Sequence, residues 1–206
     1  MTVLGTFVPN SPEWHEARRW RIGASEVSVI LGMSPWHETS ADLMARKLAG
    51  THLDITPAML RGHLLEPAVL AWGVEKHGLN YDPALSIATY ASTEHDWALA
   101  NPDAITTDGV LVEAKTTHNR NTEDGWGRAG TDTIPLAYAC QVEWACGVIG
   151  LERWTLLVLA GGLNGRPTLD FAAYRGTHNP ARYARMVAAA ARWHDRLIEE
   201  RDRTVA

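Results

Sequence analysis

The chain has 206 residues, of which 46% are apolar and 21% are charged, a balance that excludes a disordered chain and suits a single globular domain. No apolar run is long enough to cross a bilayer, and the N-terminus lacks a secretory signal, so we expect a cytoplasmic protein with no membrane partner. The formal net charge of -5 means that a nucleic-acid-binding protein of this composition must gather its basic groups locally. Cys140 and Cys146 are the only cysteines, and we expect small buried thiols, not a disulfide or a metal site.

The first fifty residues contain signals for three short helices. Ser11 followed by Pro12 and an acidic residue is typical of a helix start. Ser25 can cap the second helix and Gly32 can close it. The expected helices span residues 11–20, 26–32 and 40–48, with a turn at Ser34-Pro35-Trp36.

Arg18, Arg19 and Arg21 lie just before the predicted start of the second helix. Arginines beside a free helix N-terminus at Ser25 would suit a bound phosphate. The alternative is a basic surface cluster next to an ordinary helix cap, and these residues by themselves favour that alternative.

A longer helix is predicted from Thr56-Pro57 to about His77, with Gly78 as its end. We expect one face of this helix to point into the core, and its members are Leu60, Leu64, Ala68, Ala71 and Trp72.

Glu66 lies within this helix among apolar neighbours. A carboxylate in such surroundings is unfavourable unless it has a partner. Arg61 or His63 could supply a structural partner, and the alternative is that Glu66 contributes to a metal site.

Residues 85–91 and 97–100 have strand character, and a hairpin follows. The turn is Asp108-Gly109, and folding on it brings Asp103 close to the start of the second strand. Glu113 and Lys115 then share one strand face. Two close carboxylates repel each other, and a bound Mg²⁺ would relieve that repulsion. A lysine beside the metal can hold a water for attack on a phosphodiester. The alternative is a solvated ion pair on an exposed hairpin.

The remaining chain alternates between helices and strands. One stripe of an apolar helix is formed by Tyr138, Gln141 and Trp144. Such a stripe more often packs in a core. Gln141, however, is polar among apolar neighbours. The expected elements are a loop at 118–130, a helix at 134–148, strands at 153–160 and 168–174, and a final helix at 179–203. This order predicts one α/β domain over residues 1–206, with a core at about 11–175 and a central mixed sheet flanked by helices.

Seven short motifs in this order resemble the YqaJ-like viral recombinase family, which includes the lambda-type phage exonucleases and belongs to the PD-(D/E)xK nuclease superfamily. The motifs are Trp14-His-Glu-Ala-Arg18, Arg21-Ile-Gly-Ala-Ser25-Glu-Val, Gly32-Met-Ser-Pro-Trp36, Arg61-Gly-His-Leu-Leu-Glu66-Pro, Asn101-Pro-Asp103, Glu113-Ala-Lys115 and Tyr138-Ala-Cys-Gln141. The resemblance implies a restriction-endonuclease-like core. It also implies a metal-dependent exonuclease that digests one strand of duplex DNA from its 5′ end.

The resemblance also implies roles for individual residues. Asp103, Glu113 and the Ala114 carbonyl would bind Mg²⁺ directly, and Glu66 would serve a second ion or its waters, with Mn²⁺ as a substitute. Lys115 would position the attacking water. The remaining implied contacts are Gln141 and Tyr138 beside that lysine, and Arg18, Ser25 and Asn101 at the 5′-phosphate, with Arg19 or Arg21 as replacements for Arg18. Asn101 departs from a serine in a relative.

Further partners follow from the resemblance alone. They are double-stranded DNA ends, a single-strand annealing protein, and copies of the chain in a ring of three, within a bacterial host cell that carries a phage or prophage. Two other functions use the same acids and lysine: a PD-(D/E)xK endonuclease of restriction or junction-resolving type, and a non-catalytic protein that binds DNA ends as a recombination scaffold. Two cysteines are too few for the iron–sulfur nucleases of the superfamily.

Overall fold

The computed structural model describes residues 1–35, 38–118, 120, 123–163 and 166–205. Its centre is a four-stranded sheet in the order β4-β5-β6-β7. The strands are β4 (Ala104–Ile105), β5 (Val110–Thr117), β6 (Arg153–Leu163) and β7 (Arg166–Thr177). Only β5 and β6 are parallel among these neighbours, because helix α6 (Leu136–Ile149) carries the chain back between them.

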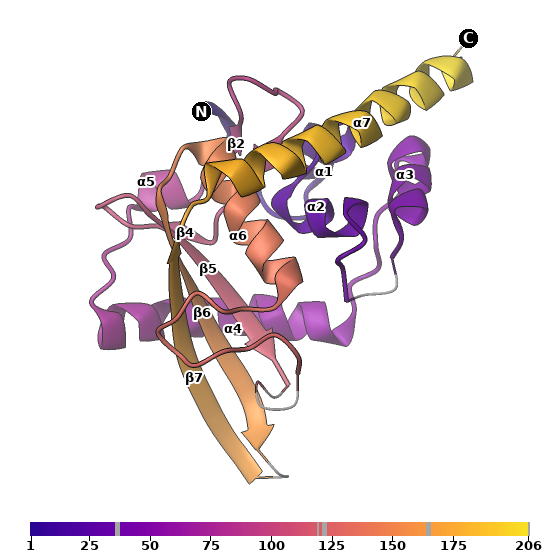
Figure 1. The fold of residues 1–206 in the computed structure, drawn as a ribbon. Coiled ribbons are helices and arrows are strands. Elements are labelled where there is room, and N and C mark those ends of the chain that lie inside the picture. Colours follow the sequence, from indigo (N-terminus) through magenta and orange to yellow (C-terminus); the bar gives the residue numbers. More distant parts are fainter. Residues whose placement is uncertain (36–37, 119, 121–122, 164–165, 206) are drawn as a thin grey trace.

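Two helices cover opposite faces of this sheet, as Figure 1 shows for α6 and α4 (Pro57–His77). Leu111 of β5 belongs to the core cluster on the α6 side, whereas Val112 packs with Val69 of α4. Successive strand residues point to opposite faces, so Glu113 and Lys115 are expected on the α6 side together with Leu111. The sheet therefore places the acid and the lysine of the hairpin under α6.

The predicted bounds of several helices are confirmed. Helix α1 (Pro12–Arg19) begins at Ser11, whose Oγ accepts the Trp14 N–H at 3.2 Å. Helix α3 (Ser40–Ala49) ends at Gly50, and α4 begins after Thr56 and ends at Gly78; both glycines have a left-handed backbone. These ends were predictable because capping is a local interaction.

The predicted cap of the second helix was wrong. Helix α2 (Ala24–Ile30) begins after Gly23, and Ser25 lies inside it, exposed. The Glu26 carboxylate accepts the Gly23 N–H at 2.8 Å, so a side chain of the helix itself caps the start of the helix. The turn expected at Ser34-Pro35-Trp36 falls partly outside the described residues, because residue 36 is not among them.

The predicted buried face of α4 was also wrong. Leu60 is 51% exposed and Leu64 is 71% exposed, and Ala68 and Ala71 are exposed as well. Val69 and Gly73 are the buried residues, and Trp72 is only half-buried. A Cβ at Gly73 would lie 2.6 Å from Leu157 Cδ1 of the sheet, so the absence of a side chain lets this side of the helix approach β6.

A second, three-stranded antiparallel sheet in the order β1-β2-β3 lies beside the first. Its strands are β1 (Thr2–Gly5), β2 (Thr89–Ala91) and β3 (Leu99–Ala100). The first strand was not predicted. The strand expected over 85–91 is wrong in its first part, because Asp82 and Pro83 begin a short helix, α5 (Pro83–Ser86).

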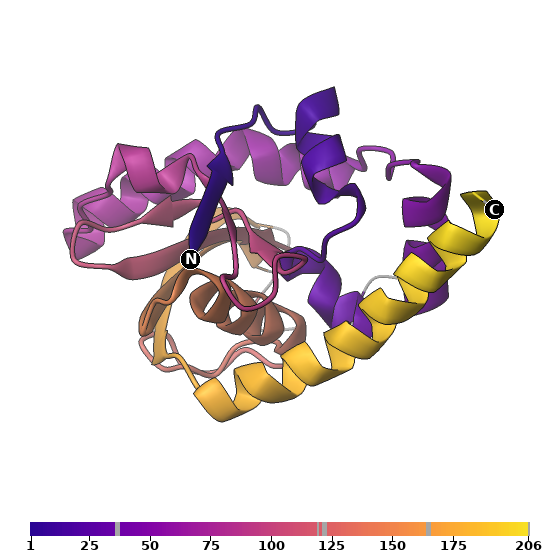
Figure 2. The ribbon, with the colours of Figure 1, turned by 90° about the horizontal axis from the view of Figure 1, so that it is seen from above.

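The long C-terminal helix α7 (Pro180–Val205) is confirmed and runs along one side of the molecule, with its end beside α3 (Figure 2). Trp193 is buried and its Nε1 donates to the Ser40 carbonyl at 3.2 Å, which ties α7 to α3. The described parts of 118–130 contain neither helix nor strand, as predicted; residues 119, 121 and 122 lie outside the description. Both cysteines are buried and free. Within the residues described, no helix combines the length and apolar character needed to span a bilayer.

Candidate active site

The predicted hairpin forms on the Asp108-Gly109 turn. Gly109 has φ +75°, a backbone conformation that favours glycine, and its N–H donates to the Thr106 carbonyl at 2.9 Å. Ala104 pairs with Val112 and Ile105 with Leu111 in antiparallel register. The turn therefore delivers the residue before Ala104 to the strand just beyond Val112.

Asp103 occupies that position, as expected. Its Oδ2 accepts the Ala114 N–H at 2.7 Å, at the edge of β5 that β4 no longer covers. The N–H and C=O of one strand residue point to the same edge, so the Ala114 carbonyl is directed toward Asp103 as well. One strand edge thus gathers a carboxylate and a backbone carbonyl.

Glu113 is buried, with 2% exposure, and one of its oxygens has two donors. Gln141 Nε2 of α6 donates to Glu113 Oε1 at 2.5 Å, and Lys115 Nζ donates to the same oxygen. The Tyr138 ring lies 5.7 Å from Lys115 Nζ, within range of a cation–π contact. The structure therefore brings together four of the predicted residues, and the polar member of the α6 stripe points at the site. Trp144 of that stripe is a core residue that donates to the Leu99 carbonyl.

Glu66 of α4 belongs to the same electrostatic environment. Burial and the nearby Asp103 raise the pKa of Glu66 to about 7, while Lys115 acts in the opposite direction. Burial and Asp103 also raise the pKa of Glu113 to about 7, and Glu66 adds to this rise. Burial raises the pKa of Asp103, although Lys115 and the Ala114 N–H oppose it. Three carboxyl groups and one ammonium group therefore act on one another's ionisation.

The pKa of the Lys115 ammonium group is raised as well, and for a lysine this rise favours the charged form. Burial would lower its pKa, but Glu113 and Asp103 outweigh burial and raise the pKa above its ordinary value. Lys115 is therefore a proton-bearing donor at neutral pH.

Neither structural partner suggested for Glu66 is found. Among the residues that the structure describes, no side chain makes a hydrogen bond or ion pair with the Glu66 carboxyl. His63 instead contacts Asn10 Nδ2 at 3.4 Å, and its charge lowers the pKa of Asp103. The half-buried Glu66 carboxyl instead lies near enough to Asp103 and Lys115 for their charges to act on its pKa.

This donor set fits a hard divalent cation. Asp103 and Glu113 supply carboxylate oxygens and Ala114 supplies a carbonyl oxygen, which are the ligand types that Mg²⁺ prefers, and Mg²⁺ keeps several waters besides. In the described part of the chain, no three His, Cys, Asp or Glu side chains form a ready metal cage. A site of two carboxylates, one carbonyl and waters needs no such cage. The mutual repulsion that raises the carboxyl pKa values is what a cation would relieve.

Two of the predicted phosphate-binding residues lie next to this site. Arg18 Nη1 donates to Asn101 Oδ1 at 2.9 Å, and Asn101 Nδ2 donates to Thr89 Oγ1 at 2.5 Å. The Arg18 guanidinium also lies 4.4 Å from the centre of the Trp14 ring. Because Asn101 precedes Asp103 by two residues, the guanidinium is tied to the segment that carries the first acid.

The side chains of the other three predicted phosphate residues make no contact with the Arg18 guanidinium in the described part of the chain. Arg19 lies over the Trp20 ring at 4.8 Å. Arg21 is held by backbone carbonyls, at 2.8 Å from Ala17 and 3.1 Å from Asp96. Ser25 is exposed on α2. Sequence reasoning also missed two buried charged residues beside Arg18, Glu26 and Lys47, although a glutamate three residues after Gly23 is the spacing of a capping box.

Comparisons with known proteins agree with this fold. Residues 13–152 match the family model described as the YqaJ-like viral recombinase domain. The uncharacterized protein YqaJ of Bacillus subtilis (strain 168) is 31% identical over 155 residues, which cover 73% of this chain and 46% of that protein. The chain thus spans about half the length of this curated relative.

Two solved structures share the architecture. The alkaline exonuclease LHK-Exo from Laribacter hongkongensis aligns with a TM-score of 0.73 at 20% identity, covering 94% of this chain and 96% of that one. A phage-related exonuclease from Haemophilus somnus 129PT aligns with a TM-score of 0.56 at 11% identity, covering 87% and 96%. The predicted α/β class, with a central mixed sheet flanked by helices, is confirmed, and the fold is that of these solved structures. Since the family model matches more than half of its residues, the chain belongs to the YqaJ-like viral recombinase domain family.

Proposed function

We propose that the chain is a metal-dependent deoxyribonuclease that digests one strand of duplex DNA from its 5′ end and leaves single-stranded tails for recombination. The observation that carries this proposal is that Asp103, Glu113 and Lys115 lie together at β5, with Gln141 of α6 on Glu113. The charge of Glu66 acts on the same group, since it adds to the rise in the pKa of Glu113. Three mutually repelling carboxyls next to a protonated lysine suit phosphodiester hydrolysis better than they suit fold stability.

In this proposal, Asp103, Glu113 and the Ala114 carbonyl hold one Mg²⁺, and Glu66 serves a second ion or its waters, with Mn²⁺ as a substitute. The bound ions supply stabilisation of the charge that develops on the attacked phosphate and on the leaving oxygen. The chain's contribution is the geometry: Asp103 is fixed by the Ala114 N–H, and Glu113 is oriented by Gln141.

Lys115 positions the attacking water. Because its pKa is raised, Lys115 donates hydrogen bonds at neutral pH and does not accept the proton of that water. The Tyr138 ring beside it restricts the ammonium group on one side. Lys115 and Gln141 share one oxygen of Glu113, so the position of the lysine depends on the glutamine.

Arg18 and Asn101 bind the terminal 5′-phosphate, which makes the enzyme an exonuclease. Contacts to phosphate read no base, so one site serves every sequence. The phosphate set also includes Arg19, Arg21 and Ser25. In the described structure these residues make no side-chain contact with the Arg18 guanidinium, although the Arg21 N–H donates to the Arg18 carbonyl at 3.1 Å. The proposed setting is the cytoplasm of a bacterial host. A single-strand annealing protein would receive the tails, and three copies of the chain would enclose the duplex.

A direct assay tests this function. Purified protein is incubated with linear duplex DNA labelled at either end, with and without Mg²⁺, and with and without a 5′-phosphate. We expect Mg²⁺-dependent release of mononucleotides from the phosphorylated 5′ end and no cutting of closed circles. Cutting of closed circles would instead identify an endonuclease, and binding of ends without cleavage in any metal would identify a scaffold.

A further inference from the structure

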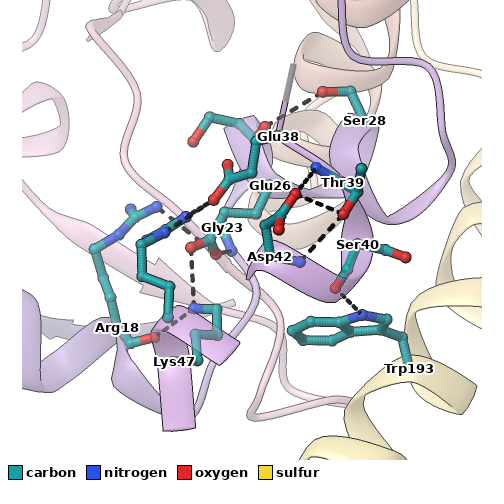
Figure 3. Close-up of polar contacts among 12 residues, drawn as sticks. Arg18, Gly23, Glu26, Ser28, Glu38, Thr39, Ser40, Asp42, Lys47 and Trp193 are labelled. Atoms are coloured by element: carbon teal, nitrogen blue, oxygen red, sulfur yellow. Dashed lines mark hydrogen bonds and ion pairs between the residues drawn. The ribbon is translucent and has the colours of Figure 1, made fainter. Parts of the chain in front are cut away.

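A group of three charged residues, two of them buried and one partly buried, lies where α1, α2 and α3 meet, and we name it the Arg18 cluster. It consists of Arg18, Glu26 and Lys47, and Figure 3 shows the three side chains converging near Gly23. Glu26 is 8% exposed and Lys47 is 5% exposed. Buried charges are retained only where partners satisfy them, so the pairing within this group decides what each member can do.

The Lys47 ammonium group is fully committed within the protein. It lies 3.0 Å from Glu26 Oε1, and it donates to the backbone carbonyls of Arg21 at 2.6 Å and Arg18 at 3.1 Å. An ammonium group has three hydrogens, and three acceptors are in place. Lys47 therefore has no donor left for a ligand.

Glu26 makes its close contacts with Lys47 and the backbone, and not with Arg18. Its Oε2 accepts the Gly23 N–H at 2.8 Å, whereas Arg18 Nη2 lies 4.0 Å from the same oxygen. Burial would raise the pKa of Glu26, but Lys47, Arg18 and the Gly23 N–H together hold it below its ordinary value. The carboxylate is thus ionised and already neutralised by Lys47.

The Arg18 guanidinium is fixed in place without being neutralised. It donates to the neutral Asn101 oxygen, lies over the Trp14 ring, and packs so closely on Gly23 that a Cβ there would fall 2.2 Å from Nη2. Two cations and one carboxylate leave the cluster with a net charge of +1. That surplus charge sits on Arg18, on the side that faces the Asn101-to-Asp103 segment.

We infer that Lys47 is a positioning residue: by neutralising Glu26, it keeps the Arg18 guanidinium for a terminal phosphate of the substrate. This inference rests on the proposed function. In the absence of the Lys47 charge, Glu26 would draw Arg18 into a direct ion pair and the cluster would be neutral. Both changes weaken phosphate binding, although Lys47 itself touches no substrate.

The test compares duplex DNA carrying a 5′-phosphate with the same duplex carrying a 5′-hydroxyl. Binding is measured by fluorescence anisotropy with Ca²⁺ in place of Mg²⁺, and the rate of digestion is measured separately with Mg²⁺. We expect Lys47→Met to lower the preference for the phosphorylated end by about 10- to 100-fold, the range for losing a hydrogen bond to a charged group, and so to match Arg18→Ala.

Two further variants separate positioning from general charge and from misfolding. Lys76→Met removes a positive charge from an exposed position of α4, where Lys76 pairs with Glu75 and not with Glu26, and it should keep the preference. The double variant Glu26→Gln with Lys47→Met should regain it, because the competitor for Arg18 is gone and the net charge returns to +1. This variant also leaves no unpaired buried carboxylate, which guards against loss of the fold.

The outcomes are distinct. Three results overturn the inference. They are a Lys47→Met protein with the wild-type preference, a double variant whose preference stays as low as that of Lys47→Met, and an equal loss of preference in Lys76→Met. A wild-type protein that digests DNA with no preference for the phosphorylated end also overturns it and leaves the nuclease proposal standing. Absence of digestion in any metal removes the nuclease proposal, while the binding measurement still decides the role of Lys47.

Discussion

Two buried glutamates in this protein, Glu113 and Glu26, have opposite electrostatic states. Each is almost inaccessible to solvent and each has a lysine within contact. Burial and neighbouring acids raise the pKa of Glu113, whereas Lys47, Arg18 and a backbone N–H lower that of Glu26 in spite of burial. The difference lies in the count of charges: three carboxyls share Lys115, but a single carboxylate shares two cations.

This comparison distinguishes a buried carboxyl that can bind a cation, Glu113, from a buried carboxylate with a structural role, Glu26. Within the Arg18 cluster, Glu26 is satisfied by Lys47 and the Gly23 N–H, so its carboxylate is a structural element, and the surplus positive charge remains on Arg18. The carboxyl group of Glu113 lacks enough positive charge around it, which is the condition that a divalent cation corrects. Burial of an acid by itself indicates neither role.

The largest expected effect concerns the lysine of the carboxyl site. We expect Lys115→Ala to lower the rate of DNA digestion by about 10²- to 10³-fold, the range for removing one positioned charge-stabilising donor. DNA binding should persist. The matched control is Lys76→Ala, because Lys76 is exposed on α4 and should leave the rate unchanged. Equal rates for wild type and Lys115→Ala would remove Lys115 from the mechanism.

The second effect is on pH dependence. With a pKa of about 7, Glu66 and Glu113 carry protons in the metal-free protein below neutral pH. A carboxyl must ionise to hold Mg²⁺, so affinity should rise as pH increases through 7, by about tenfold per pH unit for each carboxyl involved, and level off above it. Titration calorimetry with Mg²⁺ between about pH 5.5 and 8.5 measures this. A flat profile would mean that the acids do not bind the ion.

A smaller effect is expected at the glutamine. Gln141→Ala removes a donor to Glu113 Oε1 and should weaken Mg²⁺ affinity or activity by about 10- to 100-fold, as for other groups that orient a metal ligand. Leu136→Ala, an exposed position on the same helix, is the control. If the two variants behaved alike, the contact with Gln141 would be incidental.

The smallest effect tests the comparison through stability. The pKa of Glu113 is higher in the folded protein than in the unfolded chain. Between about pH 4.5 and 7 the native state therefore binds more protons than the unfolded state, and the free energy of unfolding falls as pH rises through that window. Glu113→Gln should therefore raise the melting temperature of the metal-free protein at pH 8. Glu26 has a lowered pKa and contributes stability that is present at pH 8 and lost in acid. Glu26→Gln should therefore lower the melting temperature at pH 8.

Each kcal/mol of change corresponds to a shift of about 2–4 °C for a chain of this size, which differential scanning calorimetry resolves. Shifts of the same sign in the two variants would contradict the distinction between the two sites.

Much of this protein follows from local chemistry in the sequence. The Asp108-Gly109 turn fixes the register that brings Asp103 to the Ala114 N–H, because only a few neighbouring residues form it. The ends of α4 at Thr56 and Gly78 follow from capping for the same reason. The family resemblance was likewise readable from short motifs in order, and the family is confirmed.

Other features required the packed structure. The apolar residues Leu60 and Leu64 of α4 are exposed, while Gly73 is buried. The helix turns toward the sheet the face that allows the closest approach of the two backbones, and this is not its most hydrophobic face. The spacing of Gly23 and Glu26 is a local capping signal, but the burial of the Glu26 charge depends on Lys47 of α3, which only the folded chain brings to within 3.0 Å. Residues near in sequence determine turns and caps through short-range bonds, whereas faces and buried charges depend on elements that meet only in the folded chain.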